Sequence, residues 1–380
     1  MAQPTFLEFF AGIGLVRLGL ERSGWEAVFA NDIDPKKHEM YAAAFPEDSA
    51  ERCVVGDVHE LAAAEIPGAT LATASFPCTD VSLAGYRKGL EGTQSSAFWG
   101  FTRLLENMNG RRPSIVMIEN VPGLVTSHKG SDLRAIALCL NRLGYSCDAF
   151  IVDAVNFVPQ SRARLFIIGV MDVSCSWDVS GALAGRDQRL RFSQLTEFMI
   201  ANKDVRWSIL DIPPPPRSSV QLVDVLEDLP ADSHRWWSTA RTQYLVNQMS
   251  NRHREVAERL TRDDGLHYAT VYRRVRGGVS RAELRVDNIA GCLRTPRGGS
   301  SRQILFVAGN GTRRARFMTP REYARLQGVP DAFPITVPDN QALFGFGDAV
   351  CVPAVEWIAR EVLNPLLSAS SALGAGIGKV

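Results

Sequence analysis

Short apolar runs alternate with segments of helical periodicity over roughly the first 170 residues of the chain. A strand buried on both faces of a parallel sheet has this continuous apolar character, as Ile115–Ile118 does. The predicted strands are Thr5–Phe9, Ala27–Asn31, Leu71–Ser75, Ile115–Ile118 and Leu165–Val170, and the predicted helices are Leu15–Ser23, Phe98–Asn107 and Leu133–Leu143. This alternation predicts an α/β fold built on a parallel sheet.

The alternation stops after about Val170. The run Pro213–Pro216 cannot continue a helix or a central strand, because proline lacks an N–H and fixes φ. We therefore predict a first domain over residues 1–172, a smaller and less regular second domain over 173–311, and a return to the first domain over 312–380. The small residues of Ser368–Val380 predict a flexible tail.

Charge is balanced over the whole chain but not along it. The 42 lysines and arginines and the 41 acids leave a net charge of only +1. Arginines nevertheless gather between Arg273 and Arg302, where Glu283 and Asp287 are the acids. The members of this group are Arg273, Arg274, Arg276, Arg281, Arg285, Arg294, Arg297 and Arg302. Such a local field suits a phosphate backbone, and a solvated arginine-rich surface is the alternative.

The seven cysteines and six histidines carry no metal-site or disulfide pattern. No C-x-x-C or H-E-x-x-H spacing occurs, so we predict neither a disulfide scaffold nor a metal site. A small buried hydrophobe is the default for each cysteine. No apolar run reaches about 18 residues, so a membrane span is not expected. The first residues do not resemble a signal peptide, so we expect a cytoplasmic protein.

Three turns that follow predicted strands have the residues of a nucleoside site. Glycines in Phe10–Gly14 allow close approach of a ligand, but Arg17 stands where a dinucleotide fingerprint needs its third glycine. Asp32 and Asp57 follow the next strands, where a carboxylate can bind a ribose hydroxyl or an adenine edge; a turn or N-cap role is the alternative. The candidate cofactor-binding residues of these turns are Phe10, Ala11, Gly12, Gly14, Asp32, Ile33, Asp57 and Val58.

One cysteine differs from the others in its setting. Cys78 follows Pro77 directly after a buried strand, at the same sheet edge as the glycine loop. Thiolates act as nucleophiles when positive or hydrogen-bonding groups lie near them. Glu119 follows another buried strand, while Arg162 and Arg164 are two residues apart and would share a face of an extended segment. A structural ion pair between Glu119 and one arginine is the alternative.

In chain order these pieces resemble the DNA (cytosine-5) methyltransferase family, and the match covers most of the sequence. Phe10–Gly14 resembles the family's first motif, Asn31-Asp32 the second and Gly56-Asp57 the third. Phe76-Pro77-Cys78 resembles the motif that carries the nucleophile, and Glu119-Asn120-Val121 the motif that carries an acid.

The second half of the series continues in the same order. Gln160 with Arg162 and Arg164 resembles the eighth motif, and Asp287–Arg294 with Gly298-Gly299-Ser300 resembles the ninth. Thr319-Pro320-Arg321-Glu322 opens the tenth motif, which ends on the segment Gly345–Val350. The full unpermuted series is far more specific than any one motif.

The resemblance implies a Rossmann-like sheet that binds S-adenosylmethionine and methylates C5 of a cytosine. Cys78 is then the nucleophile that adds to C6, and Glu119 holds N3 and the exocyclic amine. Arg164 would contact the base carbonyl, and Arg162 would support the site near Cys78. Because the reaction cannot occur in a stacked duplex, the base must be flipped out. Pro77, Asp348 and Ala349 join the residues expected at the cofactor.

By the same resemblance, 173–311 would be a target-recognition domain that reads double-stranded DNA, and Val81–Gln94 a loop that closes over the base. A cognate restriction endonuclease is an implied partner, and we expect a monomer. The sequence departs from the family at Glu8, usually Asp, at Leu15, usually Gly, at Thr79, usually Gln, and at Asp348, usually Asn.

Three other interpretations remain open at this stage. The tRNA-modifying branch of the family shares the catalytic motifs, but its recognition domain is small. A DNA-binding module that has lost activity would not need the intact Cys78 and Glu119. A nicotinamide dehydrogenase is disfavoured by the missing third glycine.

Overall fold

The computed structural model describes residues 3–47, 49–77, 97–171, 176, 178–276, 278–295 and 302–368. The chain divides into two compact units, each built from separate stretches of sequence. Unit 1 comprises Met1–Asp153, Ala163–Pro215 and Ala354–Val380, and unit 2 comprises Ala154–Arg162 and Pro216–Pro353. The predicted boundaries near 172 and 311 do not coincide with these, because 178–215 pack in unit 1 and 312–353 in unit 2.

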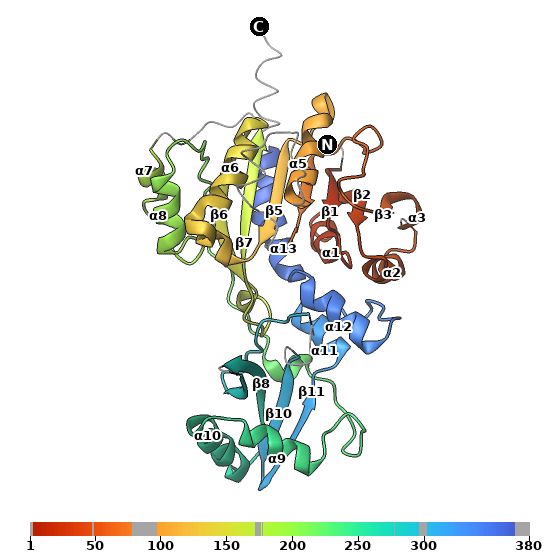
Figure 1. Cartoon of the computed structure of the whole chain (residues 1–380), viewed down its shortest axis with the longest axis vertical. Helices are drawn as coiled ribbons and strands as arrows, with labels where there is room; N and C mark the ends of the chain where they lie inside the picture. Colours follow the sequence, from red (N-terminus) through yellow and green to blue (C-terminus); the bar gives the residue numbers. More distant parts are fainter. Residues whose placement is uncertain are drawn as a thin grey trace. The chain divides into compact units, whose positions relative to one another are not determined.

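Seven strands form one sheet in the described part of unit 1, in the order β3-β2-β1-β4-β5-β7-β6 (Figure 1). The strands are β1 (Thr5–Phe9), β2 (Glu26–Asp32), β3 (Cys53–Val55), β4 (Leu71–Ala74), β5 (Ile115–Asn120), β6 (Tyr145–Asp153) and β7 (Ala163–Met171). The pairs among β1 to β5 are parallel, which places the carboxyl ends of these strands along one edge. The α/β prediction and each predicted strand are confirmed, whereas β3 and β6 were missed.

The prediction that the whole sheet is parallel was wrong for β7. This strand runs antiparallel to both β5 and β6, with Glu119 opposite Phe166 and Val152 opposite Arg164. The start of β7 therefore lies at the edge where β5 ends. The sequence of β7 does not reveal that it runs antiparallel to β5, because both strands are simply apolar runs.

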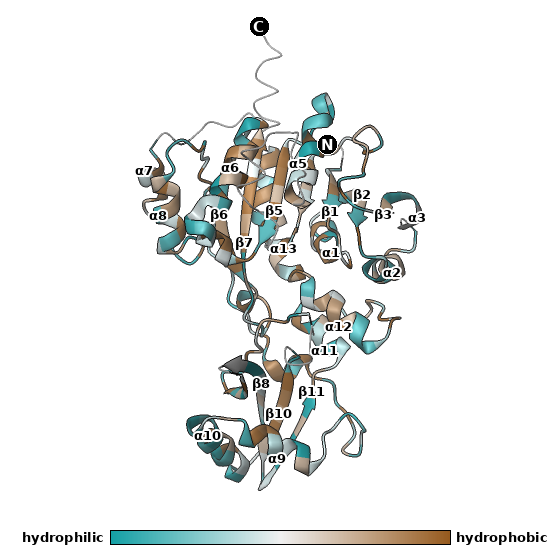
Figure 2. Ribbon diagram, in the orientation of Figure 1, coloured by the Kyte–Doolittle hydropathy of each residue, from teal (hydrophilic) through white to brown (hydrophobic). Residues whose placement is uncertain are grey.

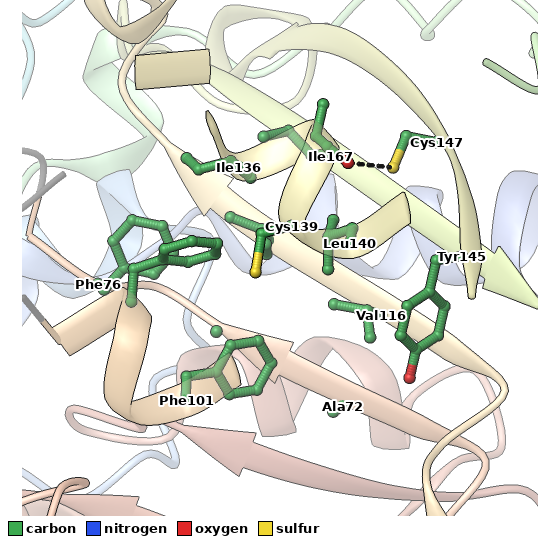
Figure 3. Packing of buried hydrophobic residues seen from close by; sticks show 14 of the residues in the cluster. Ala72, Phe76, Phe101, Val116, Ile136, Cys139, Leu140, Tyr145, Cys147 and Ile167 are labelled. Atoms are coloured by element: carbon green, nitrogen blue, oxygen red, sulfur yellow. Dashed lines mark hydrogen bonds between the residues drawn. The ribbon is translucent and has the colours of Figure 1, made fainter. Parts of the chain in front are cut away.

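The helices of unit 1 bury the apolar faces of the sheet. They are α1 (Leu15–Glu21), α2 (Pro35–Ala44), α3 (Ser49–Arg52), α5 (Ala97–Asn107), α6 (Ser131–Arg142), α7 (Val179–Leu183), α8 (Ser193–Ala201) and α13 (Val352–Ile358), which begins at the unit boundary. Phe101 from α5 and Ile136 and Cys139 from α6 pack on Val116 and Ile167 of the sheet (Figure 3). Cys139, Cys147 and Cys351 are buried, as the default for cysteine predicts, whereas Cys53 and Cys292 are only partly buried.

Unit 2 is more regular than the sequence suggested. In its described part β8 (His267–Arg276), β9 (Val279–Arg285), β10 (Ile304–Gly309) and β11 (Thr312–Phe317) form an antiparallel sheet in the order β11-β10-β8-β9. Its helices are α9 (Thr239–Asn247), α10 (Asn251–Arg262), α11 (Pro320–Leu326) and α12 (Asp339–Asp348). Asn310 and Gly311, both with positive φ, form the tight turn between β10 and β11. Asn-Gly between two apolar runs is a strong hairpin signal that the sequence analysis did not use.

The helical run Asp339–Ser368 is long and apolar enough to cross a membrane by length and composition alone. However, 72% of its most apolar window is buried inside the protein, as in the core helix of a soluble protein.

Candidate active site

The first two strands of unit 1 end in turns that are bonded to each other. Both oxygens of Asp32 accept backbone N–H groups, from Gly12 at 2.7 Å and from Asp34 at 2.9 Å. The backbone N–H of Ala11 donates to the carbonyl of Asn31 at 2.9 Å. Asp32 thus has the turn role considered as its alternative, and an ionised carboxylate keeps further lone pairs for a ribose hydroxyl.

The glycine loop has a left-handed backbone at Phe10 (φ 57°), Gly12 (φ 59°) and Gly14 (φ 80°). A Cβ on Gly12 would meet no atom within 4 Å, so space is open in front of this loop. A Cβ on Gly14 would instead lie 2.4 Å from the Phe45 ring, because α1 and α2 approach closely there. Left-handed φ at Phe10 is strained for a non-glycine residue, and such strain concentrates at functional sites.

The remaining cofactor candidates of unit 1 lie at the same edge but differ in exposure. Asp57 accepts the backbone N–H of His59 at 2.9 Å, and Ile33 is exposed. Pro77 is exposed beside Phe76, whose ring meets Phe10 edge-on at 6.2 Å. Val58 is buried, so its side chain is not open to a ligand in this structure.

Glu8, the fourth of the five residues of β1, is buried and bonds the start of the helix that follows the loop. Its Oε1 accepts the backbone N–H of Arg17 at 3.0 Å, at the start of α1, while Oε2 has no hydrogen-bond partner in the described part of the chain. Burial raises the pKa of Glu8 to about 8, and the nearby Arg17 only partly offsets this. Glu8, one of the four departures from the family, is therefore a carboxyl group whose pKa burial raises to about 8.

Glu119 and Arg164 form an ion pair at the edge where β5 ends. Arg164 Nε lies 2.9 Å from Glu119 Oε1, and the two side chains are 16% and 12% exposed. This is the structural pair named as the alternative for Glu119, and it leaves both side chains partly open to solvent. Figure 2 shows β5 turning from apolar to hydrophilic toward its carboxyl end, where Glu119 and Asn120 stand.

Asn120, which the sequence analysis gave no role, is buried and joins β5 to the turn after β4. Its Nδ2 donates to the carbonyl of Phe76 at 3.1 Å, and its Oδ1 accepts the backbone N–H of Val121 at 2.9 Å. A polar residue after the run Ile115–Ile118 was the available signal. Cys78 itself, Thr79 and the predicted loop Val81–Gln94 lie outside the described residues.

Arg162 and Arg164 have different bonding partners in the structure, and their sharing of a face stays a prediction. Arg162 belongs to unit 2, where its guanidinium donates to the carbonyls of Leu293 at 2.9 Å and Ala349 at 2.5 Å. It also reaches the carbonyls of Gly347 and Asp348, both at 3.3 Å. The backbone leaves the sheet at Asp153 and re-enters it at Ala163, so the two arginines fall on either side of a unit boundary.

The segment that ends the tenth motif is held by buried amides of unit 2. Gln327 donates to the carbonyls of Phe346 at 2.7 Å and Ala349 at 3.2 Å. A Cβ on Gly347 would lie 2.7 Å from the backbone of Arg294, so only glycine fits. Asp348 is exposed at the carboxyl end of α12, and Ala349 follows it. Gly298, Gly299 and Ser300 lie outside the described residues.

Comparison with known proteins adds identity to this geometry. A sequence profile described as C-5 cytosine-specific DNA methylase matches residues 4–364. The chain belongs to this family. It is accordingly a DNA cytosine-5 methyltransferase, and the family's methyl donor is S-adenosylmethionine.

Individual relatives match over nearly the full length. The chain is 30% identical to the Type II methyltransferase M.DsaV of Dactylococcopsis salina, over 95% of this chain and 86% of that protein. It is 29% identical to the Type II methyltransferase M.HpaII of Haemophilus parainfluenzae, over 95% and 90%. The crystal structure of S. pombe Dnmt2 methyltransferase shares the fold, with a TM-score of 0.59 at 17% identity over 96% of this chain and 99% of that one.

The first unit fits the cofactor of this family. Open space in front of Gly12, the Asp32 carboxylate and the exposed Ile33 are the surroundings that a nucleoside needs. No group of three or more His, Cys, Asp or Glu side chains could hold a metal ion within the described residues.

Proposed function

We propose that this chain methylates C5 of a flipped-out cytosine in a specific double-stranded DNA sequence, through a covalent bond between Cys78 and C6. The observation that carries the proposal is that the carboxyl ends of β4 and β5 are neighbours in the sheet and are joined by a hydrogen bond. These strands are parallel neighbours, with Ala74 opposite Ile118, and Asn120 bonds the turn that leads from β4 to Cys78. A nucleophile after β4 and an acid at the end of β5 would then face one substrate.

The chemistry requires a nucleophile, an acid and a methyl donor. The Cys78 thiolate adds to C6, and the electron pair of the C5–C6 double bond becomes available at C5. S-adenosylmethionine, when bound, supplies an electrophilic methyl group on its sulfonium. After C5 has taken the methyl group, the C5 proton leaves to solvent, the double bond re-forms and the Cys78 thiolate is expelled.

Glu119 would bond N3 and the exocyclic amine of the flipped base and stabilise the charge that develops there. Arg164 holds Glu119 at 2.9 Å, so we assign it the positioning of that carboxylate as well as contact with the base carbonyl. Arg162 would act indirectly, as a positioning residue, because its guanidinium holds the backbone carbonyls of Gly347–Ala349. Asp348 and Ala349 would then complete the cofactor site.

Double-stranded DNA is favoured over tRNA as substrate. The curated relatives are named Type II methyltransferases, which supports a partner restriction endonuclease that cuts the same DNA sequence, and action in the bacterial cytoplasm. Residues 173–311 would read the sequence, as the predicted target-recognition domain, and the enzyme would act as a monomer.

The test of the proposal is covalent trapping. A duplex with 5-fluorocytosine at the target should form a stable adduct with the wild type, because fluorine cannot leave as a cation. Cys78→Ala should form none, whereas Cys53→Ala, at a half-buried cysteine of β3, should trap normally. Methyl transfer by Cys78→Ala would contradict the mechanism.

The substrate and its sequence need separate assays. Methyl transfer to duplex DNA and to tRNA should be compared side by side, and bisulfite sequencing of DNA from cells that express the chain should give the methylated sequence. Exchanging 173–311 for the same region of a relative should change that sequence. An unchanged sequence after a well-folded exchange would contradict the recognition role.

A further inference from the structure

Three arginines of unit 2 surround a pair of aromatic rings. The rings of Trp237 and Phe317 meet edge-on with centroids 4.9 Å apart. The guanidinium carbon of Arg241 lies 4.0 Å from the Trp237 centroid and 5.4 Å from that of Phe317. Those of Arg302 and Arg273 lie 4.7 Å and 6.0 Å from the Phe317 centroid. We call these five residues the arginine cluster.

The sheet register brings the cluster together from distant parts of the sequence. Phe317 pairs with Ile304 on β10, and Ile304 pairs with Val271 on β8. Arg302 precedes Ile304 by two residues and Arg273 follows Val271 by two, so both alternate onto the same face as these partners. Arg241 and Trp237 come from α9 and the residues just before it, and α9 packs on this face.

The cluster has positive charge without a carboxylate to match it. In the part of the chain that the structure describes, no acid lies within ion-pair distance of Arg241, Arg273 or Arg302. The Nε atoms of Arg273 and Arg302 are buried with no hydrogen-bond partner there. Burial, followed by the charges of the other two arginines, lowers the pKa of Arg241.

Two other arginines of the same sheet have carboxylate partners. Arg316 pairs with Glu322 in the interior, and Arg285 pairs with Asp287 at 2.6 Å. The contrast indicates that the cluster is arranged for an anion that the chain itself does not supply. Attraction to the ring faces offsets part of the repulsion among the guanidiniums until that anion arrives.

We infer that the arginine cluster binds a backbone phosphate of the DNA substrate. The inference rests on the proposed function and names a contact for it. Three guanidiniums that converge from β8, the start of β10 and α9 suit a single compact anion, whereas one base edge is commonly read by one bidentate arginine. Arg241 is exposed and the other two are half-buried, so a phosphate can reach them.

The test compares Arg273→Gln and Arg302→Gln with Arg259→Gln in the full-length enzyme. Arg259 is an exposed arginine near the end of α10. Two residues on, the Thr261 carbonyl accepts the N–H of Gly311 at 2.8 Å, in the β10–β11 turn. The control therefore lies at the end of β11 remote from Phe317. Dissociation constants are measured for a target duplex and an unrelated duplex between about 50 and 200 mM salt.

Each cluster variant should weaken binding to both duplexes by the same factor and reduce the slope of log K against log salt by about 0.9. Arg259→Gln should behave as the wild type. Unchanged affinity and slope in both cluster variants would overturn the inference. A loss confined to the target duplex, with an unchanged slope, would also overturn it, because that result assigns the cluster to base contacts.

Failure of the proposed function would look different. In that case the wild type itself would not methylate duplex DNA. If the wild type methylates duplex DNA while the cluster variants bind as it does, the phosphate contact alone is wrong.

Discussion

The side-chain amide of Asn120 donates to the carbonyl of Phe76 at 3.1 Å, and so fixes the turn two residues before Cys78 to the end of β5. Glu119 directly precedes Asn120 on β5. One buried amide therefore links the backbone that leads to the proposed nucleophile with the strand that carries the proposed acid.

Asn120→Ala should slow covalent trapping by 5-fluorocytosine DNA. A misplacement of about 1 Å in a reacting group can cost up to about 100-fold in rate, and this change removes the bond to Phe76, two residues before the proposed nucleophile. The measurement is the trapping rate at saturating cofactor and DNA, alongside the melting temperature. Asn107→Ala, at an exposed residue of α5, is the matched control. A variant that melts earlier but traps at the wild-type rate would show that Asn120 is only structural.

Glu119 and Arg164 should be coupled in catalysis. A double-mutant cycle of Glu119→Gln and Arg164→Met, scored on the trapping rate, should give an interaction energy of about 0.5–3 kcal/mol, because the pair is partly shielded from solvent. Arg186 and Asp211 form a more exposed pair in the same unit, and a parallel cycle there should give a value near zero. Additive effects at Glu119 and Arg164 would mean that the arginine does not act through the carboxylate.

Glu8 should make stability depend on pH. Its pKa rises from an ordinary 4.5 to about 8 in the folded protein because of burial, so the folded state binds the proton more tightly. The resulting contribution to the free energy of unfolding is fully present below about pH 4.5 and is lost as the pH rises through about 8. The free energy of unfolding of the wild type should therefore fall between these values relative to Glu8→Gln, on the order of a few kcal/mol.

Glu8→Gln keeps an acceptor for the Arg17 N–H and removes the titration, so urea unfolding at pH steps across this range isolates the effect. Parallel stability curves for the two proteins would rule out a buried titrating Glu8. Glu8→Asp, which restores the usual family residue, shortens the side chain and should weaken the bond to Arg17.

Asp348→Asn should change cofactor affinity, and the direction identifies the group that Asp348 faces. Opposite charges at about 4 Å are worth on the order of 4 kcal/mol at an effective dielectric of 20. If Asp348 lies beside the sulfonium, loss of its charge should weaken the binding of S-adenosylmethionine and leave the affinity for the product S-adenosylhomocysteine unchanged. If Asp348 lies beside the cofactor's carboxylate, the substitution should raise the affinity for both ligands. Calorimetry with the two ligands decides, and equal affinities for variant and wild type would make Asp348 a turn residue.

The sequence alone predicted each element that local pattern specifies. The apolar runs gave β1, β2, β4, β5 and β7, since strands buried on both faces have little choice of composition. The order of motifs predicted the family because the first motifs are turns at strand ends and the tenth begins at a helix N-cap, where local residues determine the backbone. The strand β6 was missed because Ser146 and Asp148 interrupt its apolar run, although the left-handed Gly144 directly before it was an available turn signal.

Tertiary structure decided how these elements meet. β7 is antiparallel, and this direction alone brings Arg164 at its start to Glu119 at the end of β5; a parallel strand would have placed Arg164 at the opposite edge. Arg162, two residues earlier, is bonded within unit 2. The arginine cluster likewise depends on the pairing of β8, β10 and β11. Residue type and spacing determine turns and strands, because these depend on near neighbours in sequence, whereas strand direction and register are set by burial and hydrogen bonding summed over the whole sheet.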